Sequence, residues 1–190
     1  TIQSGAVTLQ NLTVANGTTN GLGGGINNSG ALTLSNCTIT HNTAPNGVNA
    51  GGGGAIHNNV NSNLTVNNCL ISGNSTDSGV GGAISNNGRV TVNNSTIAGN
   101  TAFSGYGGGI RNAGNVTVNN STIAGNAAGA GGGIFNLSFG TVTVNNSTIV
   151  GNSSRQVGGG LWNNSGTMTV ANSIIANNPK GDCNNPITDG

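Results

Sequence analysis

The sequence predicts an all-β protein folded as a β-solenoid of about seven coils of roughly 26 residues, with three short strands per coil. The first observation behind this prediction is a repeat. A Val-Thr-Val-like tripeptide recurs along the chain, and its copies begin at Val7, Leu32, Leu64, Val90, Val116, Val142 and Met168. The second observation is that apolar and polar residues alternate within each copy, which is typical of strands with one buried face. No segment has helical periodicity, so essentially no helix is expected.

Residues 90–115 illustrate one coil. Strands are expected at 90–92 and 95–98, separated by an Asn-Asn corner, and a third around 109–111 after a Gly-rich loop. Aliphatic residues recur at four positions in nearly every copy, so these side chains should point inward: Val90, Val92, Ile97 and Ile110.

The solenoid is predicted to cover residues 1–178. One longer interval between copies is explained by a loop insertion at 44–54, and residues 179–190 leave the pattern and form a tail or cap. Because the chain opens inside a repeat, we expect it to be a processed protein or an excised piece.

Asparagine occupies the corner in all seven copies, and asparagine tolerates a left-handed backbone. Its amide can also bond to the same residue one coil away. We therefore expect structural ladders, the first being Asn11, Asn36, Asn68, Asn94, Asn120, Asn146 and Asn172. A second ladder is predicted at Asn42, Asn74, Asn100, Asn126, Asn152 and Asn178, and a third at Asn28, Asn58, Asn86, Asn112, Asn136 and Asn163.

Two short motifs carry a resemblance to known proteins. One is Gly-Gly-[Ala/Gly]-Ile, as at 81–84 and 107–110, and the other is Ile-x-Gly-Asn, as at 97–100. Together they resemble the repeats of polymorphic outer-membrane proteins, in which the second motif is Phe-x-x-Asn. The chain is more similar still to large secreted bacterial right-handed parallel β-helix proteins, whose last coils look like residues 173–183. The resemblance implies a right-handed parallel β-helix, export from a bacterial cell and a surface role, and it transfers no catalytic residue.

The charge content is very low. The chain has four Lys and Arg and three acidic residues, all of them Asp, so it offers no electrostatic surface for nucleic acid or anionic lipid. Asp77, Asp182 and Asp189 do not form a carboxylate pair on neighbouring coils, which glycan cleavage or calcium binding would require. We therefore expect no enzymatic activity, no metal, no cofactor and no membrane insertion by this segment.

Aromatic residues fall close together near the third strand of the later coils. With one arginine they define a candidate contact face, made of Arg111, Phe135, Trp162, Phe103, Tyr106 and Phe139. Exposed rings on a polar solenoid favour sugar stacking, adhesion or lateral packing. The alternative is that loops fold over these rings and bury them.

Outward threonines form one complete row, namely Thr8, Thr33, Thr65, Thr91, Thr117, Thr143 and Thr169. A second row is broken by Leu70 and Ile174, and the corner is expected to place the two rows on different faces. Regular threonines can order water as ice does, although Thr is also a favourable exposed strand residue.

Cys37 and Cys69 occupy the same inward position in adjacent coils, where later coils carry serine. They could form a disulfide or remain as two small buried thiols. Cys183 has no partner of this kind, so it is free or pairs outside the sequence.

These observations favour an extracellular or cell-surface bacterial β-solenoid with a structural or adhesive function. It would either assemble head to tail into a fibre or form a segment of a larger surface protein. Self-association, head to tail or lateral, is the expected partnership, and a glycan or host-surface ligand is a further partner. The alternative functions are a carbohydrate-binding module that uses exposed aromatics and an ice-binding protein that uses threonine ladders.

Overall fold

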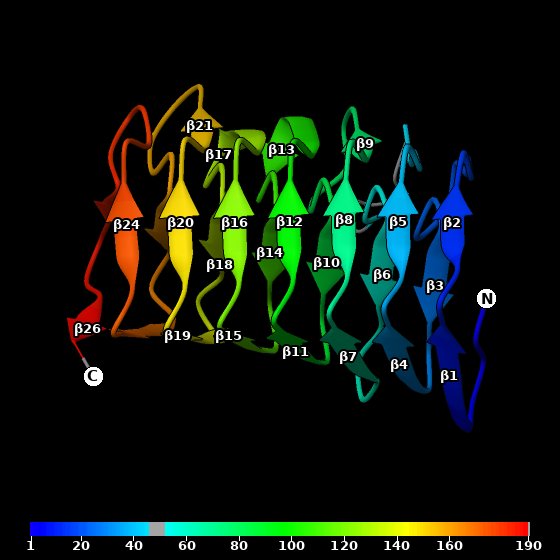
Figure 1. Ribbon diagram of the computed structural model, residues 1–190. Helices are drawn as coiled ribbons and strands as arrows, with labels where there is room; N and C mark the ends of the chain where they lie inside the picture. The colour runs from blue at the N-terminus through cyan, green and yellow to red at the C-terminus, as the bar shows by residue number, and fades with distance from the viewer. Residues whose placement is uncertain (46–51, 190) are drawn as a thin grey trace.

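The computed structural model describes residues 1–45 and 52–189, and it shows a β-solenoid of stacked parallel strands (Figure 1). The described residues contain strands and no helix, and consequently no helix long and apolar enough to cross a bilayer. The predicted all-β class and the stacking of coils are confirmed.

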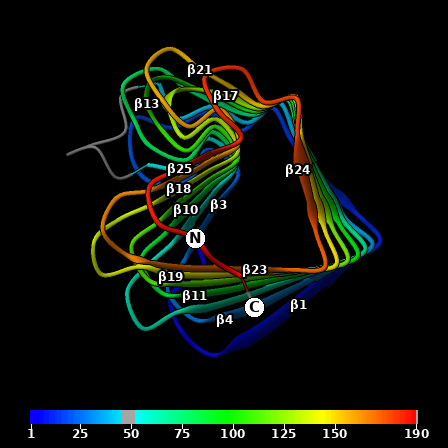
Figure 2. The ribbon, with the colours of Figure 1, turned by 90° about the vertical axis from the view of Figure 1, so that its left-hand side faces the viewer.

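Three long sheets form the sides of a triangular cross-section (Figure 2). The first sheet, in order of pairing, contains β1 (Ala6–Gln10), β4 (Ala31–Ser35), β7 (Asn63–Asn67), β11 (Arg89–Asn93), β15 (Asn115–Asn119), β19 (Thr141–Asn145), β23 (Thr167–Ala171) and β26 (Thr188–Asp189). The second sheet contains β2 (Thr13–Ala15), β5 (Thr38–Thr40), β8 (Leu70–Ser72), β12 (Thr96–Ala98), β16 (Thr122–Ala124), β20 (Thr148–Val150) and β24 (Ile174–Ala176). The third sheet contains β3 (Ile26–Asn28), β6 (Ile56–Asn58), β10 (Ile84–Asn86), β14 (Ile110–Asn112), β18 (Ile134–Asn136), β22 (Leu161–Asn163) and β25 (Cys183–Asn184).

A fourth sheet occupies the region where a Gly-rich loop was predicted. Its strands are β9 (Ser75–Thr76), β13 (Thr101–Tyr106), β17 (Ala127–Ala130) and β21 (Ser153–Ser154). The expectation of only three strands per coil is therefore wrong for the coils that contribute to this sheet. Its strands are rich in Ala, Gly and Ser and do not alternate between apolar and polar residues. They are strands because their backbone pairs with that of the neighbouring coil.

The coils stack in register, and this register keeps each column of side chains on one face. Thr91 of β11 pairs with Thr65 of β7 and Thr117 of β15. The side chains predicted to point inward are fully buried in one continuous core: Val90, Val92, Ile97 and Ile110. The periodic aliphatic residues thus place the core along the whole axis.

Glycines before the third sheet allow neighbouring coils to approach closely. Gly107 has a φ of 70°, which an L side chain rarely adopts. A Cβ on Gly108 would lie 2.5 Å from the carbonyl oxygen of Gly132 in the next coil. The repeated Gly-Gly motif is therefore required by the backbone geometry.

The two ends of the solenoid differ. At the C-terminal end, β25 and β26 extend the third and first sheets by one short strand each, while β24 stays at the edge of the second sheet. At the N-terminal end, β1 and β2 are edge strands, and only the third sheet is extended, by a bridge between Ile2 and Asn28.

The predicted insertion at 44–54 is described only in part, because 46–51 lie outside the described residues. Its flanks belong to the coils. Ala44 is fully buried and its N–H donates to the Ser75 carbonyl at 3.0 Å, and Gly54 donates to the Gly81 carbonyl at 2.9 Å.

Candidate functional site

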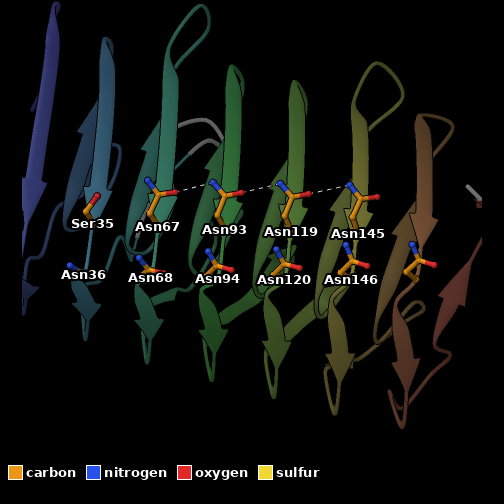
Figure 3. Close-up of a pocket in the computed structure, with 11 residues that line it drawn as sticks. Ser35, Asn36, Asn67, Asn68, Asn93, Asn94, Asn119, Asn120, Asn145 and Asn146 are labelled. Atoms are coloured by element: carbon orange, nitrogen blue, oxygen red, sulfur yellow. Dashed lines mark hydrogen bonds between the residues drawn. The ribbon is translucent and has the colours of Figure 1, made fainter.

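An open groove of about 780 Å³ runs along the corner between the first and second sheets (Figure 3). Its lining consists of one serine and two parallel columns of asparagines: Ser35, Asn36, Asn67, Asn68, Asn93, Asn94, Asn119, Asn120, Asn145, Asn146 and Asn172. The groove therefore presents uncharged amides that repeat at each coil.

Six of the seven predicted corner residues, all except Asn11, form one column of this groove. All seven have φ between 47° and 54°, the left-handed conformation expected of them. Their predicted amide ladder requires correction, because within the described chain only Asn36 donates to a corner neighbour, Asn11, at 3.2 Å. The corner residues are exposed, so water can take the place of the amide bond between coils.

The amide ladder of this groove runs one residue earlier in the sequence. Asn93 Nδ2 donates to Asn67 Oδ1 at 2.9 Å, Asn119 donates to Asn93 at 3.0 Å, and Asn145 donates to Asn119 at 3.1 Å. Sequence reasoning missed this column, although its members recur with the same 26-residue spacing as the corner. Alternation after the inward Val118 would have identified Asn119 as an outward strand residue.

The two threonine rows lie on different sheets, as the corner geometry predicts. The complete row belongs to the first sheet, where Thr91 lies two residues from Asn93 on the same face. The broken row belongs to the second sheet, where Leu70 pairs with Thr96. A single plane made of both threonine rows therefore does not exist.

Three aromatic residues of the predicted contact face, Tyr106, Phe135 and Trp162, gather into a cluster on the outside of the third sheet. The Tyr106 and Phe135 rings stack with centroids 4.7 Å apart, and Trp162 meets Phe135 edge-on at 4.9 Å. Phe135 is only 2% exposed, because Tyr106 from the preceding coil covers it. Phe135 therefore does not contribute an exposed ring, and the alternative in which loops fold over the rings holds for this residue.

The other members of this face are more accessible. Phe139 is 96% exposed, and Phe103 is 53% exposed with the Arg155 guanidinium 3.8 Å above its ring centroid. Arg111 donates to Asn87 Oδ1 at 2.5 Å, and burial lowers the pKa of its guanidinium. The structure thus separates the predicted face into a packed cluster and dispersed exposed rings.

The buried asparagines form the strongest ladders in the molecule. In the second ladder, the Asn100 N–H and Nδ2 both donate to Asn126 Oδ1 at 2.9 Å, and the same pair of bonds recurs from Asn126 to Asn152. In the third ladder, Asn86 Nδ2 donates to Asn112 Oδ1 at 2.8 Å. These asparagines are essentially inaccessible to solvent, so they hold coils together and do not form a binding site.

A carboxylate ends the second ladder. The N–H and Nδ2 of Asn178 donate to Asp182 Oδ1 at 2.9 and 2.8 Å, the same two bonds that an asparagine of a further coil would accept. In every bond of this ladder the N–H donor is directed toward the C-terminal end. The last asparagine therefore needs an acceptor, and a negatively charged carboxylate is a strong one. Asp182 was considered above only as a catalytic candidate, and its capping role follows from this contact.

Cys37 and Cys69 are free and buried, so of the two alternatives the pair of thiols is the one observed. The Cys37 N–H donates to Cys69 Sγ at 3.3 Å, just as the Cys69 N–H donates to Ser95 Oγ at 3.0 Å. The thiols therefore take the place of the serine hydroxyls, and burial raises the pKa of the Cys69 thiol.

Among the described residues, no three His, Cys, Asp or Glu side chains are grouped so that they could hold a metal ion, and the expectation of no metal stays a prediction. The lack of enzymatic activity stays a prediction from the sequence.

Comparison with known proteins identifies the fold family. A family model described as "Right handed beta helix region" matches residues 2–179, which is nearly the whole chain. Neither a curated protein nor a solved structure matches the chain. The match agrees with the parallel sheets, the coil length and the stacked asparagines described above. The chain belongs to the right-handed β-helix family.

Proposed function

We propose that this chain is an extracellular structural β-solenoid, a stiff segment that spaces or displays an adhesive surface outside a bacterial cell. The β-helix fold is consistent with a structural or binding solenoid. The observation that carries the proposal is the buried second ladder, which ties every coil from Asn42 to Asn178 to the next.

This ladder supports a mechanical role because it adds side-chain bonds to the backbone pairing. Asn126 accepts two bonds from Asn100 and gives two to Asn152. Hydrogen bonds in the dry interior are stronger than in water, and members of a chain of bonds polarise one another. Separating or bending one coil would therefore break several buried bonds at once, which makes the rod stiff along its axis.

The surface suits a role outside the cell. The outward columns consist mainly of Thr and Asn, and the chain has four basic and three acidic residues in total. Such a surface is hydrophilic and does not attract charged polymers electrostatically. The resemblance to secreted bacterial β-helix repeats supports the same location.

The two terminal coils differ in how their sheets are paired, which bears on self-association. At the C-terminal end Asp182 ends the ladder and short strands cover two sheets, which are known ways to block further pairing. At the N-terminal end β1 and β2 have unpaired edges, and the inward Val7, Leu9 and Val14 are only half-buried. We therefore expect self-association through the N-terminal coil, where another coil of the same geometry would fit.

Small-angle scattering and electron microscopy over a range of concentrations test this proposal. Seven coils spaced by about 4.8 Å give a rod roughly 35 Å long. We expect such rods alone or in end-to-end pairs, with the pairs lost in a Leu9→Lys, Val14→Lys variant. Long unbranched filaments would refute the capped C-terminal end, and compact or flexible particles would refute the stiff rod.

A further inference from the structure

We propose that the outer face of the first sheet binds ice. The surface, which we name the Thr–Asn face, consists of two parallel columns on β7, β11, β15 and β19: Thr65, Thr91, Thr117 and Thr143, and Asn67, Asn93, Asn119 and Asn145. This inference goes beyond the structural function proposed above and rests on a different observation.

The face is a two-dimensional lattice. All five residues of each strand pair in register with the next, so equivalent groups repeat along the axis at about 4.8 Å. Along each strand the threonine and the asparagine are two residues apart, or about 6.6 Å. Hydroxyl and amide groups therefore occupy regular positions in both directions.

The asparagine column is fixed before any ligand arrives. Each amide from Asn93 to Asn145 donates to the preceding one at 2.9 to 3.1 Å (Figure 3). An amide has two N–H donors and two oxygen lone pairs. One of each is used along the column, so the second donor and the second lone pair remain directed away from the column axis. An inner amide such as Asn119 therefore cannot rotate without breaking bonds to both neighbours.

A ligand for this face must itself be regular, because the asparagine column lines an open groove rather than an enclosed pocket. Only Arg89 among the residues of these four strands carries a charge. Fixed polar groups hold a first layer of water at their own repeat. The axial repeat of about 4.8 Å is close to the spacing of equivalent oxygen atoms along the a axis of hexagonal ice, so a layer bound along the columns can join the crystal.

The second sheet provides an internal control. Thr96, Thr122 and Thr148 form a threonine column there, but the neighbouring outward residues are Ala98, Ala124 and Val150, which have no amide. Leu70 and Ile174 interrupt this column and are exposed. The second sheet therefore has the same strand geometry without the second polar column.

The test compares matched variants of the intact chain. Thr91, Thr117 and Thr143 are each changed to Lys in one variant, and Thr96, Thr122 and Thr148 are each changed to Lys in the control. A third variant, Asn93→Leu with Asn119→Leu, removes the centre of the amide column. Thermal hysteresis and inhibition of ice recrystallisation are measured, and circular dichroism verifies that each variant is folded.

We expect the unaltered chain to shape and slow ice, the first and third variants to lose most of this activity, and the control to retain it. An unaltered chain without activity at any soluble concentration would overturn the proposal. Equal losses in the first variant and the control would overturn it too, because the effect would then not belong to the Thr–Asn face. Either failure leaves the rod measured by scattering intact, so the two proposals are judged separately.

Discussion

Replacing Asn126 by alanine should destabilise the solenoid far more than replacing an exposed asparagine of the same coil. Asn126 is fully buried, and its Oδ1 accepts bonds from the N–H and Nδ2 of Asn100, both at 2.9 Å. Its own Nδ2 donates to the Ile97 carbonyl at 2.9 Å. Truncation therefore leaves the Asn100 N–H without its acceptor in a dry interior and removes the amide donor of the Ile97 carbonyl, whereas Asn100 Nδ2 keeps the carbonyls of Ile71 and Ala98.

The size of this effect follows from the number of orphaned groups. A buried donor without a partner costs about 1–3 kcal/mol, so the orphaned Asn100 N–H costs about 2 kcal/mol. The control is Asn119→Ala, because Asn119 is half-buried and bonds to Asn93 and Asn145 in the same ladder fashion. Water replaces its bonds, so that change should cost less than about 1 kcal/mol.

Urea unfolding followed by circular dichroism measures both variants. The Asn126→Ala midpoint should fall well below that of Asn119→Ala, while the dependence of the unfolding free energy on urea stays the same. Similar losses in the two variants would refute the reasoning, because they would show that burial does not control the strength of the amide ladder.

Three further predictions concern the cap and the thiols. Asp182→Ala should lower the melting temperature because the last ladder amide loses its acceptor, whereas Asp182→Asn keeps an oxygen there and should melt almost as the unaltered chain does. Changing both Cys37 and Cys69 to Ser should alter the unfolding free energy by less than about 1 kcal/mol, since Ser95 makes the same bonds in the next coil. The exposed Cys183 should react with iodoacetamide before the buried thiols do. Burial, and to a smaller extent the negative charge of Asp182, raise the pKa of Cys183. The rate of its reaction with iodoacetamide should therefore still increase at a pH where the rate of an ordinary thiol has reached its plateau. Asp182→Asn removes the charge and should shift this pH profile to lower pH.

The sequence was sufficient to predict the coil because each coil packs and pairs against coils of nearly the same sequence. Val90 and Ile97 recur with the coil, and residues that recur on the inner face of every strand must meet in one core. It was insufficient for the fourth sheet. β13 contains Ala, Gly and Ser without alternation, and it is a strand because β9 and β17 lie beside it.

The candidate contact face shows a second limit of sequence reasoning. Alternation correctly places Phe135 on the outer side of its strand, but exposure depends on what covers that side. Tyr106 belongs to a longer segment of the preceding coil and stacks on the ring. Packing between segments that differ from coil to coil cannot be read from a repeat, so the exposed rings had to be found in the structure.

One coil contains asparagine in three different roles. Comparing these roles distinguishes the asparagines that the fold requires from those that are free to serve a binding function. Asn119 lies in the exposed ladder, Asn120 at the left-handed corner and Asn126 in the buried ladder. Folding explains Asn120 through its backbone and Asn126 through its buried bonds. It requires Asn119 less strictly, because water can replace its amide bonds to Asn93 and Asn145 at the half-buried surface. The recurrence of asparagine there in four successive coils, beside a complete threonine column, is therefore the part of the repeat that points to an interaction with an external lattice.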